Sequence, residues 1–97
     1  MSDIENTIKE RTKTCGEFRD ITKTSYDLKY ILRQGDKFPR IPPYMVEAMD
    51  MIAHKLARIV QGDPLFIDHW RDIQGYSRLV ETELKHNALL SNFEKGH

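Results

Sequence analysis

The sequence predicts an all-α protein, built as an antiparallel bundle of three long helices that follow a short N-terminal helix. Apolar residues recur at spacings of three and four along four segments, as they do on the buried face of a helix. Most glycines and prolines fall between these segments, and no segment alternates apolar with polar residues as a strand does. A chain of 97 residues with this composition is expected to form one domain over residues 1–97, with a core over about 3–90 and a frayed tail over 91–97.

The first two helices are bounded by residues that favour a helix end. Ser2 and Glu5 have the spacing of a capping box, so a short helix is expected over about 3–12. Gly16 then lets the chain take a positive φ angle and change direction. A longer helix is expected over about 17–33. Its predicted buried stripe consists of Phe18, Ile21, Ser25, Leu28 and Leu32.

The third helix follows a segment rich in proline. Residues 36–43 contain three of the four prolines, so they are expected to form an extended connection with a turn and no helix. Pro43 suits the first turn of the next helix, because the N–H that it lacks would have no partner there. That helix is expected over about 44–61, where Ala53 and Ala57 would let a neighbouring helix come close. Its apolar face consists of Met45, Ala48, Met49, Ile52, Leu56, Ile59 and Val60.

The last helix is expected from residue 66 or 68 to about residue 90. Gly75 lies inside it at a cost of roughly 1 kcal/mol against alanine, which often indicates close approach of another backbone or of a ligand. The wide apolar faces of the last two helices suit a homo-oligomer as well as a core, so a dimer or larger assembly is expected. The predicted buried stripe of this helix consists of Ile67, Trp70, Ile73, Ser77, Val80 and Leu84.

Charge and cysteine content limit the classes of function. The chain has 15 basic and 15 acidic residues, so its net charge does not favour binding to nucleic acid. Cys15 is the one cysteine, which rules out an internal disulfide, fits a reducing compartment and is most simply a small half-buried residue. The sequence has no run of 18 apolar residues and no apolar signal core at its N-terminus, so we expect a cytoplasmic protein without a membrane segment.

A polar stripe runs along the third helix. Glu47, Asp50 and His54 lie three and four residues apart and share one face. Two carboxylates and a histidine are suitable ligands for a divalent metal such as Mg²⁺, although a solvated helix face has the same pattern. His69 and His86 complete no zinc-binding spacing and are expected on the surface.

A second polar stripe runs along the fourth helix and consists of Asp68, Asp72 and Tyr76. The short turn between the two helices makes them neighbours, so the stripes are expected to face each other. In one interpretation Lys55 or Arg58 pairs with Asp72 or Asp68 as a structural ion pair. In the other, the carboxylates hold Mg²⁺ and the cations contact phosphate oxygens. Spacing alone favours the structural pair.

Three segments resemble a family of small phage and prophage proteins without an established function. They are ERTKTCGEF, EAMDMIAHKLARIVQGDP and DHWRDIQGYSRLVE, and they match the family patterns R-x-x-x-Y-G-x-F, E-A-x-x-M-I-x-x-K-x-A-R-I-x-x-G and D-x-W-x-D-I-x-G-Y-x-x-L. The resemblance spans about residues 9–84, and Cys15 stands where the family usually has tyrosine. It implies a phage-encoded protein in the cytoplasm of the host cell.

More remotely, the chain is similar to the MazG-like all-α nucleoside triphosphate pyrophosphohydrolases. That similarity implies bound Mg²⁺, cleavage between the α and β phosphates, and a dimer or tetramer. Glu47 and Asp50 match the E-x-x-D motif of those enzymes. The second motif, E-x-x-E, is absent, because the earlier helix offers only Glu17 and Asp20.

These observations lead to two hypotheses of function. The first is a Mg²⁺-dependent nucleoside triphosphate pyrophosphohydrolase, in which a metal-bound water attacks the substrate. The alternative is a non-catalytic anti-defence protein that sequesters a nucleotide signal or binds a host defence complex. The residues assigned to the site are Glu47, Asp50, Asp68 and Asp72 as metal ligands, of which Asp68 and Asp72 are catalytic, and Arg11, Lys55, Arg58, Trp70 and Tyr76 as ligand contacts, with Gly75 shaping its wall.

Overall fold

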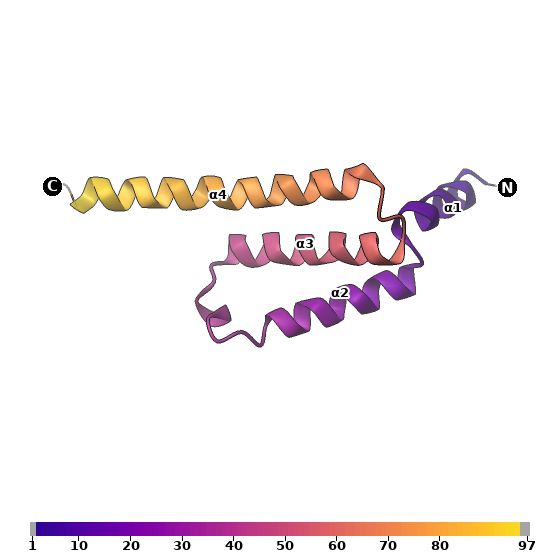
Figure 1. Cartoon of the computed structure of the whole chain (residues 1–97), viewed down its shortest axis with the longest axis horizontal. Helices are drawn as coiled ribbons and strands as arrows, with labels where there is room; N and C mark the ends of the chain where they lie inside the picture. The colour runs from indigo at the N-terminus through magenta and orange to yellow at the C-terminus, as the bar shows by residue number, and fades with distance from the viewer. Residues whose placement is uncertain (1, 96–97) are drawn as a thin grey trace.

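The computed structural model describes the backbone of residues 2–95 and the side chains of residues 2–88, and its secondary structure there is entirely helical. The prediction of an all-α fold is therefore confirmed. Helices α2, α3 and α4 lie side by side, joined at opposite ends of α3, and α1 stands at one end of the molecule (Figure 1). The elements are α1 Asp3–Cys15, α2 Phe18–Leu32, the 3₁₀ turn η1 Phe38–Arg40, α3 Pro43–Gln61 and α4 Ile67–Lys95.

The ends of α1 follow the sequence signals closely. The Ser2 hydroxyl accepts a hydrogen bond from the Glu5 amide at 3.2 Å, which caps the first turn as predicted. The helix continues three residues beyond the expected end, to Cys15, which is half-buried as expected. Gly16 then takes a φ angle of +92° and redirects the chain.

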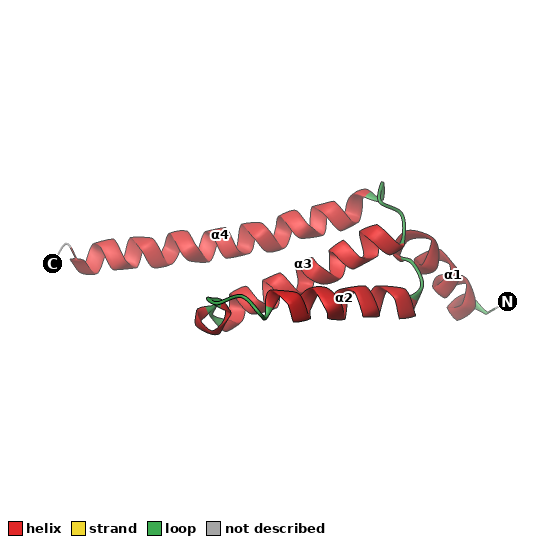
Figure 2. Ribbon diagram, turned by 60° about the horizontal axis from the view of Figure 1, so that its bottom comes forward, coloured by secondary structure: helices red, strands yellow, loops and turns green. Residues whose placement is uncertain are grey.

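The end of α1 is locked to the turn between α3 and α4. A Cβ atom at Gly16 would collide with the backbone of Gln61, and one at Gly62 would collide with the backbone of Thr14. The Thr14 carbonyl accepts a hydrogen bond from the Asp63 amide at 3.0 Å. Figure 2 shows this junction at the end of the molecule where α1 meets the end of α3. The two glycines are thus required because two backbones cross there with no room for a side chain.

Helix α3 lies between α2 and α4 and supplies most of the buried residues. Ala53 and Ala57 are almost fully buried, so small side chains do let the neighbouring helices come close, as predicted. The proline-rich connection before α3 differs from the expectation, because its residues Phe38–Arg40 form a 3₁₀ turn. A proline is compatible with the first turn of such a helix, where its missing N–H needs no partner. The buried apolar residues are Ile21, Ala48, Ala53, Ala57 and Ile59.

Helix α4 is rotated about its own axis relative to the prediction, so a different face of it meets the rest of the chain. The side that faces the rest of the chain carries His69, which bonds to Thr14, and Asp72, which pairs with Lys55. Trp70 lies one position further, about 100° round the helix, and it is 51 % exposed. The predicted stripe on α4 is therefore largely uncovered in the single chain, and Phe18 on α2 and Val60 on α3 are exposed too.

The helix α4 is also longer than expected. Its backbone stays helical through Lys95, so residues 91–95 continue the helix where the sequence predicts a frayed tail. Residues 96–97 of that tail lie outside the described residues. Within residues 2–95, none of the helices combines the length and the apolar character that a membrane span requires.

Candidate functional site

Lys55 and Asp72 form the ion pair that joins α3 to α4. Lys55 Nζ lies 2.8 Å from Asp72 Oδ2, and the Lys55 side chain is 11 % exposed. The hydrogen bond from Lys55, and next its positive charge, lower the pKa of the Asp72 carboxyl. The structural ion pair that spacing favoured is therefore present, with Lys55 as the cation and Asp72 as the anion.

Asp50 is held by a cation from a different helix. Arg33, at the end of α2, donates two hydrogen bonds of 2.9 Å to the two carboxylate oxygens of Asp50 on α3. The hydrogen bond from Arg33 is the largest cause of the lowered pKa of Asp50. Because the pairing is bidentate, it fixes the orientation of the carboxylate as well as its charge state. Arg33 was missed in the sequence, where its only signal is its place at the end of the preceding helix.

The four predicted metal ligands do not assemble into one site in the described part of a single chain. Asp50 and Asp72 are each occupied by their own cation, while Glu47 and Asp68 are exposed. Asp68 has Arg71 Nη1 at 3.9 Å within its own helix. Among residues whose side chains are described, no group of three or more histidine, cysteine, aspartate or glutamate side chains is placed to hold a metal ion.

Positive charges gather around His54 instead. Burial is the largest cause of the lowered pKa of His54, and the charges of Arg58, Lys29 and Lys55 lower it further. Arg58 Nε is buried and has no hydrogen-bond partner among the described residues. We call Lys29, His54, Lys55 and Arg58 the cation cluster. Among the side chains that the structure describes, only Lys55 of this cluster has a carboxylate in contact, so the cluster is electrostatically suited to an anion.

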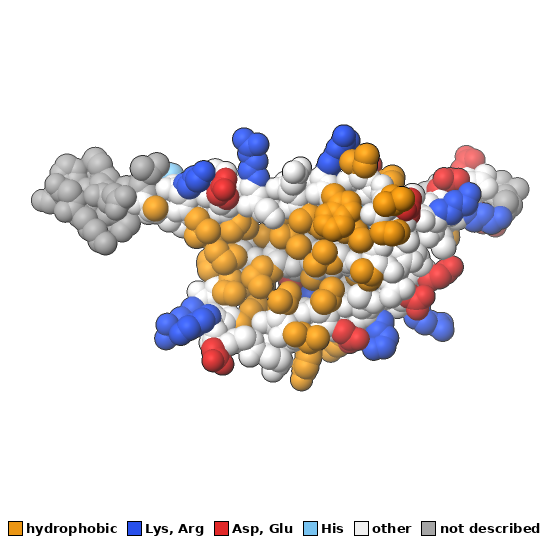
Figure 3. Space-filling model, viewed as in Figure 1, with side chains coloured by type: hydrophobic (Ala, Val, Ile, Leu, Met, Phe, Trp, Pro, Cys, Tyr) orange, Lys and Arg blue, Asp and Glu red, His pale blue; other side chains and the backbone are white. Residues whose placement is uncertain are grey.

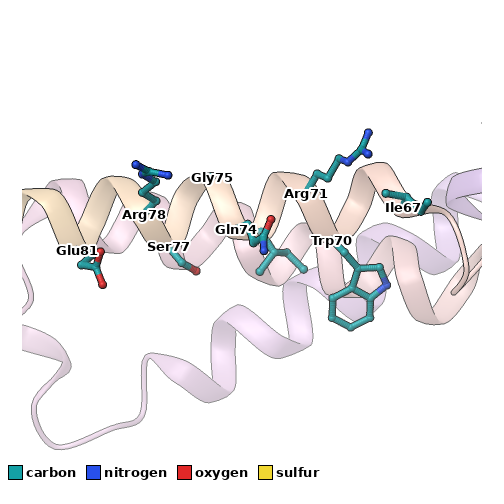
Figure 4. Close-up of a pocket in the computed structure, with 9 residues that line it drawn as sticks. Ile67, Trp70, Arg71, Gln74, Gly75, Ser77, Arg78 and Glu81 are labelled. Atoms are coloured by element: carbon teal, nitrogen blue, oxygen red, sulfur yellow. The ribbon is translucent and has the colours of Figure 1, made fainter.

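Of the remaining predicted site residues, Trp70 and Gly75 line one open hollow on α4, whereas Arg11 and Tyr76 lie elsewhere. Arg11 is exposed on α1. Trp70 donates from its indole Nε1 to the Pro64 carbonyl at 3.2 Å, and in Figure 4 its ring extends away from α4 on the side opposite Arg71. Gly75 is exposed, and a Cβ there would meet nothing within 4 Å, so among the described residues no backbone from outside α4 approaches it. Tyr76 is half-buried between α3 and α4.

A cavity of about 260 Å³ separates α3 from α4 near Tyr76. It is mainly apolar but carries two carboxylates, Glu47 from α3 and Glu83 from α4. Glu83 was missed in the sequence, although it lies seven residues from Tyr76 and so shares its helix face. The cavity is lined by Tyr44, Glu47, Ala48, Met51, Tyr76, Leu79, Val80 and Glu83.

His69 is a structural residue. It is 2 % exposed, and its Nε2 lies 3.0 Å from the Thr14 carbonyl oxygen. Its ring packs edge-on against Phe66, with the ring centroids 4.9 Å apart. The expectation that His69 lies on the surface is therefore wrong, because the end of α1 covers it and supplies its hydrogen-bond partner.

Comparison with known proteins gives no family: no family model, no curated protein and no solved structure matches the chain.

Proposed function

We propose that this chain is a nucleotide-handling phage protein that binds the phosphate groups of a nucleotide at the cation cluster without turning it over. The observation that carries the proposal is the buried Nε of Arg58, which has no partner among the described residues and lies, like Lys55, within electrostatic range of His54. A buried donor without a partner costs free energy, and a phosphate oxygen would satisfy it. Arginine suits this role because its planar group can donate two hydrogen bonds to one phosphate.

The arrangement of the carboxylates favours binding over metal-dependent catalysis. A magnesium site would have to release Asp50 from the two hydrogen bonds of Arg33 and Asp72 from Lys55. A phosphate anion would leave both ion pairs in place and would need only the Arg58 side chain to turn its buried Nε toward the ligand. The ligand is accordingly a nucleotide or a nucleotide-like signal, and sequestration of that signal in the cytoplasm of a host cell is the biological role that we propose.

The test is a binding measurement with nucleoside mono-, di- and triphosphates in the presence of a chelator. Arg58→Gln should raise the Kd at least tenfold, because a charge-assisted hydrogen bond contributes about 1.5–3 kcal/mol. Arg19→Gln, which removes an exposed arginine from α2, is the matched control and should leave the Kd unchanged. Equal binding by the two variants would refute the proposal, as would the absence of binding to every nucleotide.

A second candidate function is Mg²⁺-dependent hydrolysis of a nucleoside triphosphate. It is supported by Glu47 and Glu83, which reach the same cavity from facing helices, with Asp50 one turn from Glu47. Carboxylate oxygens on facing helices are the ligands that Mg²⁺ prefers. This function predicts a nucleoside monophosphate and pyrophosphate as products, lost in Glu47→Gln and in Glu83→Gln.

The two functions separate in one further experiment. Thermal shifts with nucleotide alone support the binding protein, whereas shifts that require Mg²⁺, together with pyrophosphate release, support the enzyme. A pull-down that recovers a host defence protein, with no nucleotide bound in either condition, would support the third role, direct binding of a defence complex.

A further inference from the structure

A stripe of mainly apolar side chains on α4 is only partly covered by the rest of the chain. It consists of Trp70, Ile73, Ser77, Val80 and Leu84, which follow one another at spacings of three, four, three and four. We call these five residues the α4 stripe. This spacing is that of the a and d positions of a coiled coil, which form the seam between two helices. Yet Trp70 is 51 % exposed and Leu84 is 49 % exposed, because α4 meets α3 through the neighbouring positions.

The chain as a whole exposes more surface than a compact protein of its size. Its accessible surface is 7737 Å², whereas a compact monomer of 11.4 kDa exposes roughly 5,800 Å². Part of this excess of about 1,900 Å² comes from the elongated shape of the chain, whose extents are 66 × 26 × 23 Å, but it is large enough to include the roughly 800 Å² that each partner gives to a standard interface. The radius of gyration, 17.5 Å, likewise exceeds the roughly 12.5 Å of a compact domain of this length.

The uncovered apolar surface is continuous. Figure 3 shows hydrophobic side chains gathered on one face of the molecule, over α4 and the helices beside it, with charged side chains at the edges. In the close-up of Figure 4, Trp70 and Ser77 point to one side of α4, while Arg71 and Arg78 point away from it. A patch of this kind, apolar with a polar rim, is typical of a protein–protein interface.

From this surface we infer that a second copy of the chain covers the α4 stripe, with the two α4 helices antiparallel and a two-fold axis at Ser77. Ser77 lies seven residues from Trp70 and seven from Leu84, so an antiparallel pairing sets Trp70 against the partner's Leu84 at both ends of the contact. At each end of the contact, the large ring of Trp70 then packs against the smaller side chain of the partner's Leu84. Serine is small enough for the two helices to approach closely at the axis.

Charge is compatible with this arrangement. The chain has no formal net charge, so two copies do not repel each other as a whole. Gln74 and Glu81 flank the stripe on one edge, and the antiparallel register sets each Glu81 beside the partner's Gln74, where the amide can donate a hydrogen bond to the carboxylate. The proposal concerns the α4 stripe and does not depend on the cation cluster.

Cysteine cross-linking in the full chain tests both the interface and its register. Starting from Cys15→Ser, the variant Ser77→Cys should form a disulfide-linked dimer under mild oxidation, because its two Cα atoms meet at the axis within the reach of a disulfide. Leu84→Cys should not link to itself, since the two positions lie about 21 Å apart along antiparallel helices. Thr82→Cys, on the far side of α4, is the matched control and should form no disulfide-linked dimer.

Sedimentation equilibrium of the wild-type chain gives the solution state independently. We expect a dimer that Leu84→Lys weakens at least tenfold, with an unchanged helical circular dichroism spectrum, because Leu84 is already half-exposed within its own chain. A monomer at concentrations up to about 100 µM, or a dimer that Leu84→Lys leaves intact, would overturn the proposal. Self-linking of Leu84→Cys would overturn the antiparallel register.

Discussion

Replacing Gly16 with alanine tests the crossing of two backbones that fastens α1 to the rest of the fold. Gly16 has φ +92° and ψ 178°, a region of backbone conformation that is almost restricted to glycine and costs other residues about 1–3 kcal/mol. The added methyl group would also collide with the backbone of Gln61. Moving a packed backbone to relieve such overlap costs about another 1–3 kcal/mol. The free energy of unfolding should therefore fall by about 2–6 kcal/mol.

The expected change in melting temperature follows from the size of the chain. The unfolding entropy of a chain of 97 residues is about 0.2 kcal/mol per kelvin, so each kcal/mol lowers Tm by about 5 °C. Gly16→Ala should thus lower Tm by at least about 10 °C. The measurement is thermal unfolding followed by circular dichroism at two protein concentrations, because association of chains also shifts Tm.

Gly75→Ala is the matched control. Gly75 lies in the middle of α4, and a Cβ there would meet nothing within 4 Å. Alanine is favoured over glycine in a helix by up to about 1 kcal/mol, so Tm should rise by up to about 5 °C. If Gly16→Ala melts within about 2 °C of the parent protein, the backbone crossing accommodates the added methyl group without cost. The claim that this position requires glycine would then be wrong.

Three more predictions concern charge and packing. The pKa of His54 is lowered in the folded state, so its contribution to the free energy of unfolding should be constant above the unfolded pKa of about 6.5 and decrease as the pH falls below it. Urea unfolding at pH 7.5 and 5.5 measures this difference. His54→Gln should remove the part of the pH dependence that His54 causes. Asp72→Asn should lower Tm more than Lys55→Met, because it leaves the buried ammonium of Lys55 without its carboxylate; an equal or reversed order would contradict that account. Ala57→Leu should cost about 1–3 kcal/mol and about 5–15 °C in Tm, because Ala57 is fully buried between helices, whereas Val60→Leu at an exposed position should change Tm by less than about 2 °C.

The local features of the fold could be predicted from the sequence because each depends on a few neighbouring residues. The Ser2 cap and the turn at Gly16 follow from the chemistry of helix ends, and both are present. The predicted third helix, about 44–61, agrees with α3 to within one residue. Its alanines, Ala53 and Ala57, lie in the helix contacts as expected.

The orientation of α4 could not be predicted in the same way. Its apolar period pointed to Trp70 as a buried residue, yet the contacts that orient the helix are polar and come from distant segments. His69 is held by the Thr14 carbonyl on α1, and Asp72 by Lys55 on α3. The spacing of apolar residues along one helix cannot predict such contacts, because each depends on a residue elsewhere in the chain.

The same reason limited the prediction of the site. Spacing correctly placed Glu47 and Asp50 on one helix, one turn apart. It gave no sign that Arg33 would reach across from α2 and occupy Asp50 with two hydrogen bonds. Helix spacing identifies which residues share a face. Whether a cation or a metal occupies a carboxylate on that face depends on side chains from other helices, which the spacing does not reveal.

The way α1 is attached has a consequence for local unfolding. No residue of α1 is buried, Ile4 and Ile8 are exposed, and the helix is joined to the fold at its last turn, around Thr14. A helix of 13 residues is marginally stable by itself in water. Amide hydrogen exchange should therefore form a gradient along α1: rapid in its first turns, and slowed at Asp63 and at the junction to nearly the rate of global unfolding. The N-terminal turns would then open and close many times within the life of one folded molecule.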